Sequence, residues 1–209
     1  MSYPGAKKSP AVFLWVMLMS TLVLDGCMHT GGDKPIQFYR LTAGSGLDMR
    51  FPAATKPLDM DMTVGLGPIH IPEYLGRPQM MVAVTEHRYR LSEEHRWAEP
   101  LEQNISLALF QALPGLLGTD RIVRYPWPQR QLVDYQIGID ILEFNIDASA
   151  QSRLIAQWSI KRKGQAGIDR RSVIQFPAST TDYEAMVRAQ SQCLGKLAQE
   201  IAVTLRQNQ

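Results

Sequence analysis

Residues 135–144 read YQIGIDILEF, and residues 153–160 read RLIAQWSI. In both stretches an apolar or aromatic residue recurs at every second position, with mostly polar or small residues between. This spacing places the apolar side chains on one face of a β-strand and leaves the other face wet. Strands of that kind are typical of an antiparallel sheet, so we expect these two strands to belong to one.

Further strands are expected where alternation or β-branched composition recurs, at residues 36–41, 63–71, 80–84, 88–91, 121–123 and 168–176. The alternation slips near Gly67 and Pro68, which indicates a β-bulge. The segments 80–84 and 88–91 are expected to form a hairpin that turns at Glu86 and His87.

A first helix is predicted over residues 97–113, where Leu101, Ile105, Ala108, Leu109 and Ala112 fall at helical spacing. Pro100 suits the first turn, where its missing N–H costs nothing. Pro114 and Gly115 are the expected stop. Residues 92–96 read as a polar link before this helix.

A final helix is predicted to start at a capping box formed by Thr181 and Glu184. Its apolar stripe comprises Tyr183, Met186, Val187, Gln190, Leu194, Leu197, Ile201 and Leu205. Cys193 adjoins the stripe and is expected to be a buried, inert thiol. Together these elements predict an α+β domain over residues 36–209: an antiparallel β-sheet with two amphipathic helices packed on one face.

Residues 1–26 have the layout of an export signal. Lys7 and Lys8 precede an uncharged run at residues 11–24. The run is shorter than the roughly 20 residues that cross a bilayer, which favours a signal peptide over a retained membrane anchor. Residues 27–35 are polar, with glycines and a proline, and are expected to form a flexible tether.

The signal ends in Leu24-Asp25-Gly26-Cys27, which resembles a bacterial lipobox. That motif has a leucine three residues before a cysteine that becomes lipidated, and stable membrane anchoring takes more than one acyl chain. Asp25 departs from the motif, which has a small or apolar residue there. Met28, rather than Asp, follows the cysteine, and by resemblance to lipoprotein sorting this predicts the outer membrane.

Composition and motifs exclude several other classes of function. The net charge of +2 gives no broad basic stripe, so we expect no nucleic-acid partner. The sequence has no G-x-S-x-G, P-loop, H-E-x-x-H or Rossmann glycine pattern. His29 beside Cys27 supplies two ligands where structural zinc wants four. We therefore expect neither an enzyme, nor a cofactor, nor a metal site.

Three recognition blocks hold the unusual residues: GPIHIPEYLGRPQM at 67–80, RWAEPL at 96–101 and YPWP at 125–128. Aromatic, Arg and Pro residues in loops suit a partner-binding surface. The candidate partner-binding residues are Tyr74, Arg77, Trp97, Glu99 and Trp127. The alternative, in which both tryptophans are core anchors and the prolines only shape turns, stays open.

The order and spacing of the recognition blocks resemble the PqiC (YmbA) family of ABC-type transport auxiliary lipoproteins, across residues 36–205. The resemblance implies a non-enzymatic component of an intermembrane lipid transport system. On this basis the domain would sit at the periplasmic face of the outer membrane, held by acyl chains on Cys27. It would dock an MCE-domain protein whose lipid tunnel spans the periplasm.

Two further questions stay open at this point. A tubular partner has rotational symmetry, which would suit a homo-oligomer of this chain. The alternative function is a structural or regulatory envelope lipoprotein that binds a cell-wall synthase.

Overall fold

The computed structural model describes residues 34–42, 62–128 and 132–208. The chain divides into two units, Met1–Pro35 and Ile36–Gln209, and the second contains every helix and strand described below. The predicted signal peptide and Cys27 lie outside the described residues. No helix in the described part of the chain is both long and apolar enough to span a bilayer.

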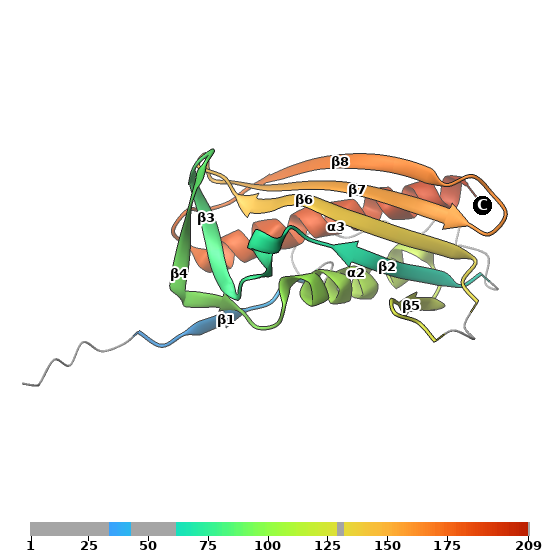
Figure 1. Ribbon diagram of the computed structural model, residues 1–209, viewed down its shortest axis with the longest axis horizontal. Coiled ribbons are helices and arrows are strands. Elements are labelled where there is room, and N and C mark those ends of the chain that lie inside the picture. Colours follow the sequence, from blue (N-terminus) through green and yellow to red (C-terminus); the bar gives the residue numbers. More distant parts are fainter. Residues whose placement is uncertain (1–33, 43–61, 129–131, 209) are drawn as a thin grey trace, which may run out of the picture. The chain divides into compact units, whose positions relative to one another are not determined.

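One mixed sheet organises this second unit (Figure 1). Its eight described strands are β1 (Gln37–Tyr39), β2 (Val64–His70), β3 (Gln79–Thr85), β4 (Arg88–Trp97), β5 (Ile122–Arg124), β6 (Tyr135–Ile146), β7 (Gln151–Arg162) and β8 (Ile168–Pro177). Strands β1, β4, β3, β6, β2 and β5 are neighbours in that order. Strand β7 pairs with β6 and carries β8 on its other side.

The prediction of an antiparallel sheet was wrong for four of the seven strand pairs. Strand pairs β3–β4, β6–β7 and β7–β8 are antiparallel, but β1–β4, β2–β5, β2–β6 and β3–β6 are parallel. Alternation shows that one face of a strand is buried, which favours antiparallel pairing but does not fix the direction of each neighbour. A better signal lies in β2, where four consecutive residues from Val64 to Gly67 are buried, as is typical of parallel strands.

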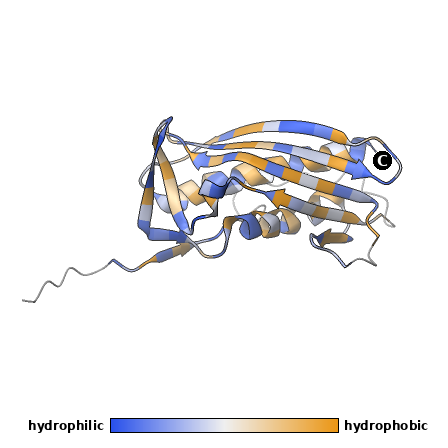
Figure 2. Ribbon diagram, in the orientation of Figure 1, coloured by the Kyte–Doolittle hydropathy of each residue, from blue (hydrophilic) through white to orange (hydrophobic). Residues whose placement is uncertain are grey.

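The two strands of strongest alternation agree with the sequence. Strands β6 and β7 cover these stretches, and hydrophobic and hydrophilic residues alternate along both (Figure 2), with most of the apolar ones buried. Ile137, Ile139 and Trp158 are at most 4% exposed. The predicted bulge is present, because the register of β2 against β6 shifts between Leu66 and Ile69.

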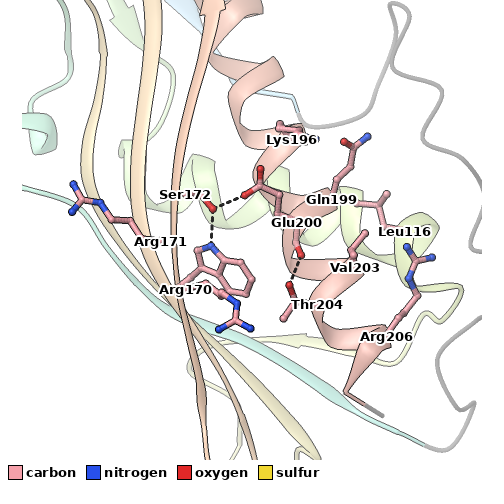
Figure 3. A pocket seen from close by; sticks show the side chains of 11 residues that line it. Leu116, Arg170, Arg171, Ser172, Lys196, Gln199, Glu200, Val203, Thr204 and Arg206 are labelled. Carbon is pink, nitrogen blue, oxygen red and sulfur yellow. Dashed lines mark hydrogen bonds between the residues drawn. The ribbon is translucent and has the colours of Figure 1, made fainter.

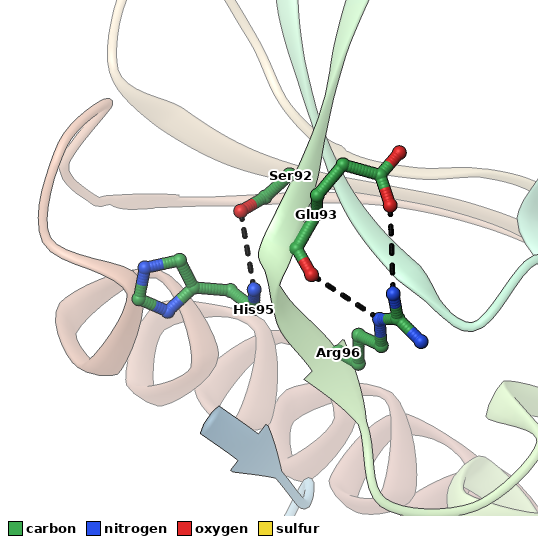
Figure 4. Close-up of polar contacts among 4 residues, drawn as sticks. All are labelled: Ser92, Glu93, His95 and Arg96. Carbon is green, nitrogen blue, oxygen red and sulfur yellow. Dashed lines mark hydrogen bonds and ion pairs between the residues drawn. The ribbon is translucent and has the colours of Figure 1, made fainter. Parts of the chain in front are cut away.

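Strand β4 is longer than predicted, since residues 92–96 continue it as far as Trp97. Figure 4 shows why this polar segment suits a strand: the His95 ring lies on one side, while Glu93 and Arg96 form an ion pair on the other. The His95 ring stacks on Tyr183 at a centroid distance of 3.7 Å, and its Nδ1 lies 2.8 Å from the Tyr39 hydroxyl. Partners from β1 and the last helix thus order this segment.

Helix α2 (Leu101–Leu117) begins later and ends later than predicted. It starts after Pro100 because Trp97 still belongs to β4. It continues through Pro114, which in the last turns removes a single helical hydrogen bond. Leu117, which follows, is fully buried. The helix ends at Gly118, which has φ 70° and donates its N–H to the Pro114 carbonyl at 2.8 Å.

Helix α3 (Tyr183–Gln207) carries the predicted apolar stripe, which is buried except for the half-buried Tyr183, but its N-cap differs. Asp182 caps it instead of Thr181, and the Asp182 carboxylate accepts from the backbone N–H groups of Glu184 and Ala185. Cys193 is free and fully buried, as expected. Burial raises the pKa of the Cys193 thiol to about 11, which keeps it protonated and inert.

Both helices pack on the buried face of the sheet, as predicted. Helix α3 contacts β6, β7 and β8, whereas α2 contacts β2, β5 and α3 itself. A short 3₁₀ helix, η1 (Glu73–Gly76), connects β2 to β3 and touches α2. The carboxyl end of β2 and the first turns of α2 therefore lie near each other.

Candidate partner-binding cleft

The three recognition blocks meet at one cleft of about 320 Å³ between β2 and the first half of α2. The first block contributes Gly67 to His70, the second Glu99 and the third Tyr125. The remaining lining residues are Leu66, Glu102, Gln103, Ser106, Leu107 and Arg124. Segments far apart in the sequence therefore share one concave surface.

The floor of this cleft depends on the backbone at Gly67. This residue has φ +121°, which L side chains rarely adopt, and a Cβ there would lie 2.5 Å from the Tyr125 Cβ. The Tyr125 N–H donates to the Leu66 carbonyl at 2.9 Å, and the Gln136 side-chain amide donates to the Gly67 carbonyl at 3.1 Å. The first and third blocks are thus in direct contact. The peptide bonds before Pro68 and Pro126 are both cis.

Trp127 supports this arrangement from behind. Its half-buried ring covers Gly65, where a Cβ would come within 2.9 Å of the indole. The same ring meets the Tyr125 ring edge to face, at a centroid distance of 5.5 Å. Tyr125 is 56% exposed, so Trp127 holds an aromatic side chain at the cleft wall.

Glu99 is fixed at the opposite wall by a buried amide. Its Oε1 accepts from the Asn104 Nδ2 at 2.9 Å, and the Asn104 Oδ1 accepts from the Leu41 N–H at 2.8 Å. Asn104 is 1% exposed, so its side chain joins three segments of the core. The carboxylate of Glu99 therefore has a defined position in the cleft.

The lining carries charges of both signs. The carboxylates of Glu99 and Glu102 lie on the α2 side, and the guanidinium of Arg124 lies on the side of the sheet, where the His70 ring also lines the cleft. The Arg124 guanidinium lies 5.8 Å from the centre of the Phe110 ring, within the range of a cation–π contact. A mixed set of donors, acceptors and one exposed aromatic ring suits recognition of a polypeptide surface.

The other candidate residues lie outside the cleft lining. Trp97 is 7% exposed and belongs to the core, and its backbone N–H donates to the Pro78 carbonyl at 2.8 Å. Tyr74 is half-buried beside Tyr89 of the β3–β4 hairpin, and burial, followed by the nearby Tyr89, raises the pKa of Tyr74 to about 12. Arg77 is exposed just after η1.

Sequence reasoning missed the contribution of α2 to the cleft. Glu102, Gln103, Ser106 and Leu107 form one shoulder of this helix, in which the first two are exposed and the last two half-buried. Three of the four are polar, and their helical spacing is that of any solvent-facing helix surface. Only the approach of β2 makes them part of a site.

Comparisons with known proteins agree with the fold. A crystal structure of an uncharacterized protein is 18% identical with a TM-score of 0.65, covering 82% of this chain and 99% of that one. A Xanthomonas campestris protein assigned to DUF330 is 16% identical with a TM-score of 0.61, covering 82% and 98%. The PelC dodecamer of Paraburkholderia phytofirmans is more distant, at 10% identity and a TM-score of 0.39 over 69% and 91% of the chains.

No curated protein matches the sequence. A family model does match: it spans residues 47–202 and describes an ABC-type transport auxiliary lipoprotein component. This family is one of transport auxiliary components and not of catalysts. The match covers most of the chain and all three recognition blocks, so the protein belongs to the ABC-type transport auxiliary lipoprotein family.

Proposed function

We propose that this lipoprotein works in an intermembrane lipid transport system, where it docks an MCE-domain, periplasm-spanning protein at the outer membrane. The docking surface would be the cleft between β2 and α2. The convergence of the three recognition blocks on that cleft carries the proposal. These blocks are the segments whose sequence resembles auxiliary lipoproteins of such systems.

The construction of the cleft supports a role in docking. Its walls are held by Trp127, Glu99 and the backbone at Gly67, so little ordering is needed when a partner binds. The exposed ring of Tyr125 supplies the type of aromatic anchor that is enriched at interfaces. Tyr74 and Arg77, on the connection through η1, would contact the partner beyond the rim.

Site-specific crosslinking tests this surface in cells. A photoreactive amino acid at Gln103, in the cleft, should capture the MCE-domain protein. The same amino acid at Gln111 should not, although Gln111 is also exposed on α2. Equal capture from both positions, or capture from neither, would contradict docking at the cleft.

The partner captured at Gln103 also separates the alternatives. A cell-wall synthase in the crosslinked band would support the structural or regulatory function instead. A crosslink between two copies of this chain would assign the cleft to a homo-oligomer and would also overturn docking there.

We propose further that Cys27 is the lipid anchor and that it places the domain at the periplasmic face of the outer membrane. Several acyl chains on one residue give stable anchoring, because each buried methylene contributes roughly 0.8 kcal/mol. The Cys27→Ala chain should leave the outer-membrane fraction and become soluble once its signal is removed. Continued flotation of this variant with outer membranes would disprove the anchor.

A further inference from the structure

A second hollow lies away from the cleft, between β7, β8 and the second half of α3 (Figure 3). Its volume is about 490 Å³, which is within the range of roughly 300–1,000 Å³ typical of small-ligand sites. It is open to solvent along one side of α3. We call this hollow the basic groove, after the residues described below.

Four cationic residues line the groove: Arg170 and Arg171 of β8, and Lys196 and Arg206 of α3. The side chain of Arg171 is directed away from the helix, whereas those of Arg170, Lys196 and Arg206 border the groove beside it (Figure 3). Among the described residues, none of these three forms an ion pair. The same end of the sheet is strongly basic in sequence, since residues 161–171 contain five basic residues and one acidic residue. Such a concentration of charge attracts anions.

The groove also has an apolar floor. Leu116 of α2 and Trp158 of β7 are nearly buried, and Val203 of α3 is 43% exposed beside them. Cations that surround an apolar floor match a ligand with an anionic head and a hydrocarbon body. An inorganic anion would use only the first of these features.

The one carboxylate in the groove is held in place. The Ser172 hydroxyl donates to the Glu200 Oε2 at 2.6 Å and accepts from the Trp158 Nε1 at 2.8 Å. This chain of hydrogen bonds fixes the Trp158 ring as part of the floor and draws Glu200 toward β8. The three cations then leave a net positive lining.

We propose that the basic groove binds one anionic phospholipid, with its phosphate at the cationic rim of the groove and its first acyl carbons on the apolar floor. A folded protein partner fits less well, because stable protein interfaces cover about 800 Å² on each side and this groove is small and concave. The site shares no lining residue with the partner-binding cleft, so each can fail without the other.

Titration calorimetry on the full chain in neutral detergent tests the proposal with a water-soluble lipid, dihexanoyl phosphatidylglycerol. The chain with Arg170→Gln, Lys196→Gln and Arg206→Gln should bind this lipid about tenfold more weakly or worse, because charge-assisted hydrogen bonds to the phosphate are lost. Arg88→Gln is the control. Arg88 is exposed on β4 and is not among the residues that line the groove, so binding should be unchanged.

Three further measurements decide the chemistry of the ligand. Inorganic phosphate should bind at least about tenfold more weakly than the lipid, because it cannot cover the apolar floor. Equal affinity for phosphate would make this a simple anion site and overturn the lipid assignment. Tighter binding of an acidic peptide than of the lipid would also overturn the lipid assignment. Unchanged lipid binding by the chain with all three substitutions would overturn it too, once circular dichroism shows that this chain is folded.

Discussion

The cleft and the basic groove are built by different means. Backbone conformation and buried hydrogen bonds shape the cleft, through Gly67, the indole over Gly65, and Asn104 behind Glu99. Long side chains on exposed surfaces line the groove, and only its floor is fixed. Substitutions that alter the cleft should therefore destabilise the protein, because the shape of the cleft is part of the fold. The charged residues of the groove can be replaced without harm to folding.

The largest effect is expected at Gly67. The Gly67→Ala chain must either keep a strained positive φ or move Tyr125, whose Cβ would lie 2.5 Å from the new methyl group. Strain and overpacking together should lower the free energy of unfolding by roughly 2–5 kcal/mol. Urea denaturation followed by circular dichroism measures this change.

Gly115 is the matched control, because a Cβ there meets no atom within 4 Å and its φ is ordinary. Gly115→Ala lies on the exposed side of α2 and should stabilise the chain by up to about 1 kcal/mol. Similar losses for the two alanines would show that the backbone at Gly67 has no special place in the cleft.

A smaller loss is expected at Asn104. Alanine there leaves the Leu41 N–H without its buried acceptor and frees the Glu99 carboxylate, so unfolding should become easier by roughly 1–3 kcal/mol. Thermal denaturation gives the comparison. Glu99→Ala removes only the half-buried partner and should cost less. An equal loss for both would mean that Asn104 acts mainly through Glu99.

At the floor of the groove, Ser172→Ala removes the acceptor for the Trp158 indole N–H and the donor to Glu200. A buried donor without a partner should reduce stability by roughly 1–2 kcal/mol, measured by urea denaturation. Glu200→Gln keeps an oxygen that can accept from Ser172 and should retain nearly full stability. If it instead matches the Ser172→Ala loss, the negative charge of Glu200 is what stabilises this chain of hydrogen bonds.

The smallest effect on folding is expected at the rim of the groove. The Arg170→Gln, Lys196→Gln and Arg206→Gln chain should unfold within about 0.5 kcal/mol of the unsubstituted chain for each replaced charge, as is usual for solvated side chains. Differential scanning calorimetry checks this value. A loss as large as that of Gly67→Ala would erase the contrast between the two sites.

Much of the fold was readable from periodicity, and the failures share a cause. The burial of β6, β7 and α3 follows from apolar spacing within each segment, and the bulge at Gly67 and Pro68 follows from a slip in that spacing. Whether a strand is parallel or antiparallel to its neighbour depends on which other segment of the chain pairs with it, and spacing within one segment does not report this. The strand character of residues 92–96 likewise depends on the Tyr39 and Tyr183 rings around His95.

The cleft could be predicted only in part for the same reason. Glu99 was recognised from its block, and Trp127 proves to support the wall from behind. Tyr125 and the polar shoulder of α2 were not singled out, because nothing local distinguishes an exposed tyrosine or glutamine in a site from one in plain solvent. The rim of the groove joins side chains from β8 and from two separate turns of α3.

The short strand β1 has a mechanical consequence. The chain enters the domain there, and β1 lies parallel to β4, with Tyr39 opposite Trp97. Beyond it the Leu41 N–H is held by Asn104 and the Thr42 N–H by the Ser191 hydroxyl at 3.1 Å. Tension applied along the chain at Lys34 would load these hydrogen bonds together, in shear, instead of peeling them one by one. A pull on the N-terminal segment would thus be shared between the β1–β4 pairing and the buried Asn104, the same side chain that positions the cleft.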